Sequence, residues 1–157
     1  MKTYNKFILE NKIYDDFYII YDTDRYVYHI TSESCANKIK EEGFKTGYEL
    51  GVCEKRKAVY FADKDVNYGV YARNGEFDEY KGENIGEVKV NIKGLKLLNM
   101  TYKNKDGIWE NHKKYSAFVV RGELENIDLD IDGTISFLED GRIYEVCLPK
   151  NVANKLL

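Results

Sequence analysis

The spacing of apolar residues along the chain predicts a protein built mainly from short β-strands. In several segments apolar and polar positions alternate with a period of two, which is typical of strands with one buried face. The predicted strands are Phe17–Tyr21, Arg25–Thr31, Ala58–Phe61, Ile85–Ile92, Leu95–Met100, Ile135–Leu138 and Arg142–Leu148. Turn residues at Asp22–Asp24 predict a hairpin between the first two strands, and Asp140–Gly141 predicts a hairpin between the last two.

The best-specified helix follows the second strand. Ser32 is one of several capping residues there, and Ala36 and Ile39 fall on one face of the helix that it would begin. Gly43 is a natural residue for a helix stop, and Phe44 just after it is expected to pack back on the helix. Strand, cap, helix and stop therefore form one consistent local unit.

Two further helical segments are predicted. Asp63–Asp65 offers an N-cap for a short helix that carries Tyr68 and Tyr71. A loop with a helix is expected around Trp109, and Ser116–Gly122 fits either a strand or a helix end. The helices are few and short, and the strands dominate.

These elements predict a single domain over residues 1–157 with an α+β fold and a mostly antiparallel sheet system. A chain of 157 residues can bury a core without disulfides or metal. Residues 1–16 are polar and weakly patterned, so they are expected to form a peripheral segment at the edge of the domain.

Composition narrows the functional classes. Lys and Arg number 24 and Asp and Glu 27, so a net charge of −3 gives no electrostatic footprint for a long nucleic-acid groove. Three cysteines without a Cys-x-x-Cys pair and only two histidines argue against a zinc site or a disulfide framework. The first thirty residues lack the pattern of a signal peptide, and no apolar run approaches the about 20 residues of a membrane span. A cytoplasmic protein is expected.

Some residues stand where chemistry would be placed. His29 ends a strand directly before a capped helix, a position where backbone N–H groups and hydroxyls converge on ligands. Each candidate also has an ordinary structural interpretation: a strand histidine for His29, a helix cap for Thr31 and core packing for Tyr60. Fourteen tyrosines suit half-buried strands, and they can also line a pocket.

Two of these segments carry a resemblance to a known family. YHITSESCANKIKEEGF resembles the first motif of ADP-ribosyltransferases of the diphtheria-toxin and poly-ADP-ribose-polymerase type, in which a strand ends in His-Gly-Ser/Thr and a helix closes at Gly-Phe or Gly-Leu. Gly43 lies fourteen positions after His29, an interval that suits that motif. AVYFADKDVNYGVYA is similar to the second motif, an Ile/Val-Tyr-Phe-Ala strand before a helix that bears a tyrosine. The match covers residues 25–72.

The last part of the chain, DGTISFLEDGRIYEVCLPKNV, is similar to the final hairpin of small bacterial and phage members, and to some phage anti-CRISPR members of this fold. Glu139, Asp140 and Glu145 are the acids available for the third motif. Glu139 is preferred because it ends the apolar ISFL strand before the Gly141 turn. Glu145 comes second, because strand alternation can turn it inward.

The resemblance implies split antiparallel sheets, NAD as a substrate and a role for each matching position. His29 would bond the adenosine-side ribose, Thr31 the nicotinamide carboxamide, and Tyr60 would lie under the nicotinamide ring. The residues expected to contact NAD are His29, Ile30, Thr31, Tyr60, Phe61, Tyr68 and Tyr71, and the expected catalytic set is Glu139, His29 and Tyr60. Ile30 stands where the family usually has Gly, so the backbone is expected to approach nicotinamide less closely, or the ligand to differ.

The implied activity is that of an NAD-dependent mono-ADP-ribosyltransferase, a glycosyltransferase acting on a protein or nucleic-acid target of a host, as a toxin or a phage anti-defence effector. A carboxylate would stabilise the oxocarbenium-like state formed when the nicotinamide–ribose bond breaks, and no metal is required. The alternative is an inactive module of the same fold that binds a nucleotide or a protein partner. An RNA 2′-phosphotransferase-like enzyme would share the fold, but the sequence shows no cluster of Arg and His for a 2′-phosphate.

Overall fold

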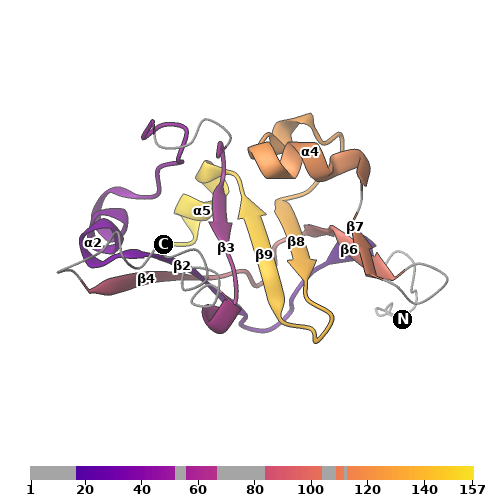
Figure 1. Cartoon of the computed structure of the whole chain (residues 1–157), viewed down its shortest axis with the longest axis horizontal. Coiled ribbons are helices and arrows are strands. Elements are labelled where there is room, and N and C mark those ends of the chain that lie inside the picture. The colour runs from indigo at the N-terminus through magenta and orange to yellow at the C-terminus, as the bar shows by residue number, and fades with distance from the viewer. Residues whose placement is uncertain (1–16, 52–55, 67–83, 104–108, 112) are drawn as a thin grey trace.

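The computed structural model describes residues 17–51, 56–66, 84–103, 109–111 and 113–157 (Figure 1). The architecture is mixed α+β with a few short helices, as the sequence predicts. In chain order the elements are β1 (Tyr18–Ile19), β2 (Tyr26–Ser32), α2 (Glu33–Glu42), β3 (Val59–Phe61), β4 (Ile85–Asn91), β5 (Leu97–Asn99), β6 (Thr101–Lys103), β7 (Trp109–Asn111), α4 (Lys113–Arg121), the 3₁₀ turn η3 (Leu124–Asn126), β8 (Gly133–Phe137), β9 (Ile143–Leu148) and α5 (Lys150–Lys155).

A five-stranded sheet with the order β1-β5-β8-β9-β3 forms the centre of the fold. Its neighbours are antiparallel except for β5 and β8, which run parallel. The predicted hairpin between the last two strands is confirmed, since β8 and β9 pair with Ile135 opposite Val146. On the other side of β9, Tyr60 of β3 lies opposite Cys147.

The predicted hairpin between the first two strands is wrong. β1 joins the five-stranded sheet beside β5, whereas β2 pairs with β4 to form a separate two-stranded sheet. The physical reason is that β4 offers a seven-residue partner with a matching apolar face, so that Val27 lies opposite Val90 in the core. The polar residues 22–24 let the chain cross from one sheet to the other, and the carbonyl of Tyr21 accepts a 2.8 Å bond from the N–H of Gly94 there.

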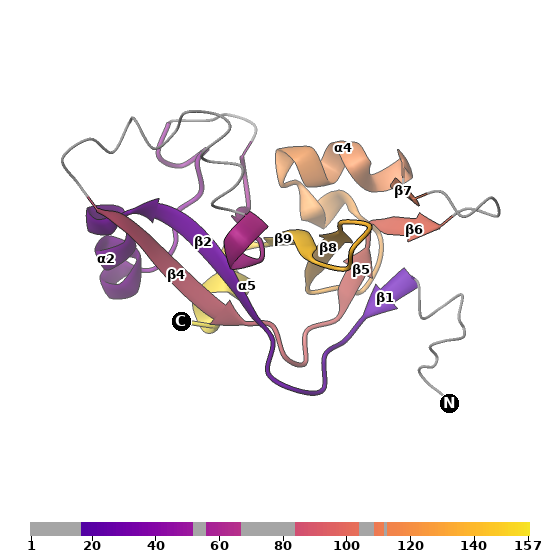
Figure 2. The ribbon, with the colours of Figure 1, turned by 60° about the horizontal axis from the view of Figure 1, so that its bottom comes forward.

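The two sheets meet where β2 crosses the end of β3. Tyr28 and Ala62 exchange two backbone hydrogen bonds, of 2.8 and 3.0 Å, in an isolated antiparallel bridge. Figure 2 shows β2 and β4 as a layer inclined to the central sheet, with α4 on the far side. This bridge makes β2 the link between the two sheets.

The predicted helix after the second strand is confirmed as α2. The Ser32 hydroxyl accepts a 3.2 Å bond from the N–H of Cys35, and the helix ends at Gly43 with φ of 92°, a conformation that favours glycine. Ala36 packs so closely on β4 that a Cβ at Gly86 would lie 2.8 Å from the Ala36 Cβ. Phe44 is buried beyond the stop, as expected.

The segment around Trp109 differs from the expected helix. Trp109–Asn111 is strand β7, which pairs with β6, and the helix α4 begins only at Lys113. Aromatic residues suit strands, and Trp109 pairs with Lys103 of β6, which lies close before it in the chain. Ser116–Gly122, left open between strand and helix end, lies at the end of α4. The predicted Asp63–Asp65 cap leads into helical residues 64–66, beyond which the expected helix lies outside the described residues.

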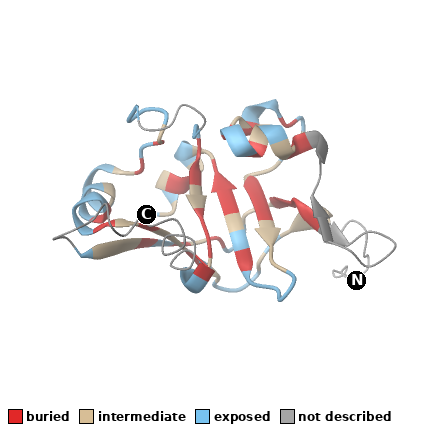
Figure 3. Ribbon diagram, in the orientation of Figure 1, coloured by how far each residue is buried: buried red, intermediate tan, exposed pale blue. Residues whose placement is uncertain are grey.

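The buried side chains form two clusters, one on each face of the central sheet. Figure 3 shows that buried residues run along the strands of this sheet. The larger cluster packs the face with Phe61, Ile135 and Val146 against β2, β4, α2 and α5. The smaller one packs the opposite face, through residues such as Leu98 and Cys147, against α4 and η3. Because side chains alternate along a strand, each residue of β3 and β9 belongs to one face or the other. None of the helices among the described residues is long and apolar enough to cross a membrane.

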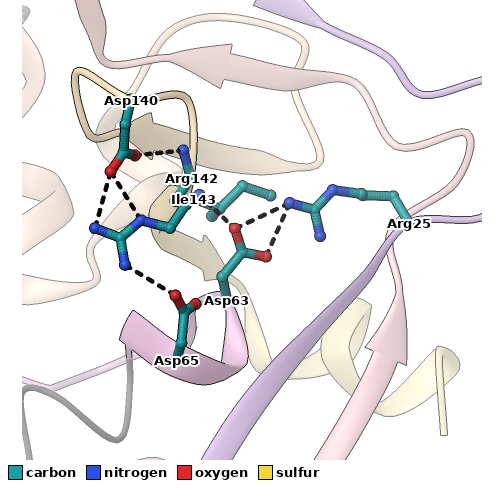
Figure 4. Close-up of polar contacts among 6 residues, drawn as sticks. All are labelled: Arg25, Asp63, Asp65, Asp140, Arg142 and Ile143. Atoms are coloured by element: carbon teal, nitrogen blue, oxygen red, sulfur yellow. Dashed lines mark hydrogen bonds and ion pairs between the residues drawn. The ribbon is translucent and has the colours of Figure 1, made fainter.

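One carboxylate ties the ends of three segments together (Figure 4). Asp63, just after β3, forms an ion pair of 2.8 Å with Arg25 before β2, and the same guanidinium lies 3.0 Å from its second oxygen. That second oxygen also accepts a 2.7 Å bond from the backbone N–H of Ile143, the first residue of β9. Asp63 is mostly buried, so these bonds are shielded from water.

We predict that Asp63→Asn destabilises the fold by about 2 kcal/mol, because it removes one charge from a shielded, hydrogen-bonded pair and leaves the other. Chemical denaturation at neutral pH measures the loss. Asp65→Asn is the matched control: Asp65 also pairs with an arginine, Arg142, at 2.9 Å, but both side chains are exposed, so little change is expected. Equal effects of the two substitutions would contradict the central role of Asp63.

Candidate functional site

The face of the central sheet that meets α4 carries a group of polar and titratable side chains. Tyr60 on β3 lies opposite Cys147 on β9, and Glu145 stands two residues before Cys147 on the same side of the strand. Across β9, Thr134 pairs with Cys147 and Ser136 pairs with Glu145. The register of three strands thus brings these five residues to one face.

Tyr60 is anchored at both ends of its side chain. Its hydroxyl donates a 2.9 Å hydrogen bond to the carbonyl of Val119 in the last turn of α4. The guanidinium carbon of Arg56 lies 4.2 Å from the centre of its ring, a cation–π contact. Burial raises the pKa of the Tyr60 hydroxyl far above its usual range, so the group stays protonated at neutral pH. It can act as a hydrogen-bond donor and as an aromatic surface.

Glu145 is a partly buried carboxyl in the middle of this face. Burial raises its pKa above the ordinary value, and the positive charge of Arg56 opposes that rise. Its charge in turn raises the pKa of both Tyr60 and Cys147. A carboxylate with little solvation next to a guanidinium is the kind of group that stabilises a developing positive charge.

Cys147 is an inert member of the group. Burial, followed by the charge of Glu145, raises the pKa of its thiol to about 12. The thiolate that a nucleophile requires is therefore negligible at neutral pH. Its sulfur lies 4.0 Å from the carbonyl of Val119, which fits a packed, structural thiol.

His29 reaches the same strand from the other sheet. Its Nδ1 lies 2.9 Å from the backbone carbonyl of Tyr60, and because a carbonyl only accepts, Nδ1 carries the proton. Burial lowers the pKa of His29, and the nearby charge of Arg56 lowers it further, so the ring is neutral at pH 7. The ring packs edge-on against Phe44 and Phe61, with centroids 5.7 and 6.0 Å away. In this tautomer Nε2 is an acceptor that can receive a bond from a ligand hydroxyl.

The other residues expected to contact NAD do not all lie on the same side of their strands. Thr31 is partly exposed and lies on the same side of β2 as His29, two residues away. Ile30 is buried on the opposite side of β2, and Phe61 is buried in the larger core cluster, on the face of β3 opposite Tyr60. Tyr68 and Tyr71 lie outside the described residues.

The three candidate acids occupy different environments. Glu139 is exposed in the turn between β8 and β9, and Asp140 is exposed beside it. A hydrogen bond from the Arg142 side chain, with an N–O distance of 2.9 Å, lowers the pKa of Asp140. Glu145 alone among the three lies on the face that carries Tyr60.

Arg56 is a site residue that the sequence analysis missed. Its charge acts on the pKa of His29, Tyr60, Glu145 and Cys147, so it stands electrostatically at the centre of the group. A signal was present in the sequence. Positions 56, 58 and 60 alternate with the residues between them, so an extended chain leading into β3 places all three on one side. Arg56 and Tyr60 are the polar members of that series.

Among the described residues, no three His, Cys, Asp or Glu side chains form a group that could hold a metal ion. The polar groups that the candidate site offers for binding or chemistry are the Glu145 carboxyl, the Arg56 guanidinium, the Tyr60 phenol and the neutral His29 imidazole. Comparison with protein-family models, with curated proteins and with solved structures finds no match to this chain.

We predict that Glu145→Gln stabilises the protein at neutral pH. The pKa of Glu145 is raised in the folded state, so the charged form destabilises the fold above that pKa, and the penalty disappears in acid as the carboxyl is protonated. Urea unfolding should show the variant more stable at pH 7 and equal to the wild type near pH 4. Glu139→Gln, at the exposed turn, should leave stability unchanged at both pH values; a destabilised Glu145→Gln at pH 7 would show that the carboxylate is structural.

Proposed function

We propose that this protein is an NAD-dependent mono-ADP-ribosyltransferase that modifies a protein or nucleic-acid target. The observation that carries the proposal is that Tyr60 and Glu145 share one face of the central sheet, while His29 bonds the Tyr60 backbone carbonyl from the other side of β3 and the Arg56 charge acts on all three. A histidine, a tyrosine and an acid are the three residue types that the resemblance assigns to the three motifs of the family. Here they come from three strands that are distant in the sequence.

The proposed chemistry is the transfer of ADP-ribose from nicotinamide to an acceptor. The bond between the ribose C1′ and the nicotinamide nitrogen breaks, nicotinamide leaves as a neutral molecule, and C1′ passes through an oxocarbenium-like state. The Glu145 carboxylate stabilises that positive charge and accepts a bond from the ribose 2′-hydroxyl. The acceptor nucleophile then forms the new bond to C1′ and releases its proton to a nearby base or to water.

The remaining residues are assigned to binding. Nε2 of neutral His29 accepts a hydrogen bond from a ribose hydroxyl, while its Nδ1–H continues to donate a hydrogen bond to the Tyr60 carbonyl. Arg56, whose backbone precedes β3 and whose side chain is exposed, is suited to a pyrophosphate oxygen. Thr31 supplies a hydroxyl on the side of β2 that His29 occupies. Movement of Arg56 from the Tyr60 ring to the phosphates would free that ring as a surface for nicotinamide.

Glu145 replaces Glu139 as our preferred catalytic acid. A carboxylate stabilises a transition-state charge best where water is excluded, and Glu139 is exposed in the hairpin turn, whereas Glu145 is partly buried beside Tyr60. The two acids lie six positions apart on the same hairpin, so the third motif of the resemblance accommodates either. The burial of the carboxyl decides between them.

The second candidate function is binding without turnover. It is favoured by the two contacts that hold Tyr60, the Arg56 guanidinium over its ring and the hydroxyl bond to α4, because both suit a purely structural tyrosine. In that case the protein would bind a nucleotide or a protein partner through the same face. Nicotinamide release separates the two functions.

We predict that the wild-type protein, incubated with NAD and a cell lysate or nucleic acid, releases nicotinamide and labels a target. Glu145→Gln should lower the rate roughly 100-fold or more, because it removes the charge that stabilises the transition state. Glu139→Gln is the matched control on the same hairpin and should keep wild-type activity. Loss of activity in Glu139→Gln alone would move the catalytic role to the turn. No nicotinamide with any lysate or nucleic acid would reject the transferase in favour of the binding module.

We predict that His29→Asn weakens NAD binding about tenfold, the size expected for one lost hydrogen bond. An Asn amide can take the place of Nδ1 and keep the bond to the Tyr60 carbonyl, but it has no counterpart of Nε2. Titration calorimetry measures the affinity, and thermal unfolding of the same variant reports any structural loss. His29→Gln, whose amide reaches the place of Nε2, should bind NAD more tightly than His29→Asn; the reverse order would return His29 to a structural role.

A further inference from the structure

The positive charge of the candidate site has no carboxylate partner. Among the described residues, no hydrogen bond or ion pair engages the guanidinium of Arg56, which lies instead over the ring of Tyr60, 4.2 Å from its centre. The Arg56 backbone is held on both sides. Its carbonyl accepts a 2.9 Å bond from the N–H of Tyr48, and the next N–H, that of Lys57, donates a 3.0 Å bond to the carbonyl of Arg121. The exposed side chain can therefore leave the ring while the backbone stays in place.

The Glu145 carboxylate also lacks a partner. It is partly buried on the face that carries Tyr60, and no hydrogen bond or ion pair within the described ranges reaches its side chain. Burial raises the pKa of this carboxyl and the Arg56 charge opposes the rise, although the two groups do not form an ion pair. A buried acceptor without a donor costs free energy, so a ligand that brings positive charge beside it is favoured.

These two features together define one chemical class of ligand. The guanidinium is a flat cation that lies over an aromatic ring, with an unpaired carboxylate on the same face of the sheet. A pyridinium ring is also flat and positively charged, so the Tyr60 ring and the Glu145 carboxylate would attract it in the same way. A neutral ring of the same shape would stack without either electrostatic contribution.

We propose that the face of the Tyr60 ring under Arg56 is a binding site for a planar cation, which Arg56 occupies as an internal competitor, so that a free ligand has to displace the guanidinium. The identity of the natural ligand, the positively charged nicotinamide ring of NAD, rests on the proposed function. An exposed cation–π contact is weak, whereas a guanidinium binds a phosphate through charged hydrogen bonds. NAD carries both a pyridinium and a pyrophosphate, so the molecule that needs the site also offers Arg56 a stronger partner.

A small probe separates this site from phosphate binding. Nicotinamide methylated at its ring nitrogen carries the positive ring without a phosphate, and nicotinamide itself is the neutral counterpart. NMR titration of the full chain measures both affinities. Arg56→Gln removes the competing charge and should bind the methylated probe about threefold or more tightly than the wild type, the size of one exposed cation–π contact. Nicotinamide should gain less, because no charge repulsion is relieved for a neutral ring.

Lys57→Gln is the matched control. It removes the same charge one position away, from a lysine that lies 5.0 Å from the centre of a different ring, that of Tyr48, and forms a 3.1 Å ion pair with Glu123. Affinity for the methylated probe should stay close to the wild-type value. Circular dichroism of every variant checks that the fold is kept.

Glu145→Gln, added to Arg56→Gln, tests the carboxylate and should weaken binding of the methylated probe about threefold or more, because the nearby negative charge is lost. Equal affinity of the wild type and Arg56→Gln for the probe, or no binding by any variant, overturns the proposal. A gain in Lys57→Gln as large as that in Arg56→Gln overturns it as well. Release of nicotinamide from NAD reports separately on the transferase. Turnover without the Arg56 effect excludes the competitor, and the Arg56 effect without turnover establishes the cation site and excludes the transferase.

Discussion

The fold depends on the carboxylate of Asp63. This side chain holds Arg25 at the entrance of β2 and the backbone N–H of Ile143 at the start of β9, while its own N–H bonds to the Ile143 carbonyl at 3.1 Å. It therefore fixes where β3 ends relative to both sheets. A second direct link is the backbone bridge between Tyr28 and Ala62, one residue earlier. Two adjacent residues thus set the position of the two-stranded layer on the central sheet.

The geometry of the candidate site follows from the same junction. With Ala62 and Asp63 fixed, Tyr60 must lie opposite Cys147, and Glu145 comes to the same face. The bridge to β2 also places His29 within 2.9 Å of the Tyr60 carbonyl. Arg142, which pairs with Asp65 and Asp140 on the surface, attaches the β8–β9 turn to the same region. The site residues are held by backbone register, so substitutions in their side chains can be studied with the scaffold intact.

Local signals in the sequence predicted local structure well. The Ser32 cap, the Gly43 stop and the hairpin between the last two strands all depend on residues close in the chain, and the structure contains them. The pairing of β2 with β4 depends on a partner distant in the chain, which periodicity does not identify. The strand at Trp109 is only three residues long, too short for its alternation to be recognised, although its partner β6 lies close in the chain. For the site, His29 and Tyr60 were brought forward by motif; in the structure the His29 ring bonds the Tyr60 backbone carbonyl, and the Tyr60 side chain lies on the other face of β3. Choosing Glu145 over Glu139 required knowing which of the two carboxyl groups is buried. Recognising Arg56 as a site residue required knowing which face of β3 packs against α4.

The stability of the fold and the proposed chemistry place opposite demands on Glu145. An apolar residue at this position would pack against the neighbouring strands without desolvating a charge, and the raised pKa of the carboxyl shows that the fold disfavours its ionised form. The Arg56 charge reduces that cost, but Arg56 is exposed and its attraction is screened by water. The same incomplete solvation makes the carboxylate effective against a developing positive charge, since less water has to reorganise when the charge appears. Tyr60 and Cys147 are held by α4 and remain protonated beside it, so Glu145 is the acid that this face offers among the described residues. The proposed transferase therefore depends on that carboxylate, whichever acceptor the transferred group reaches.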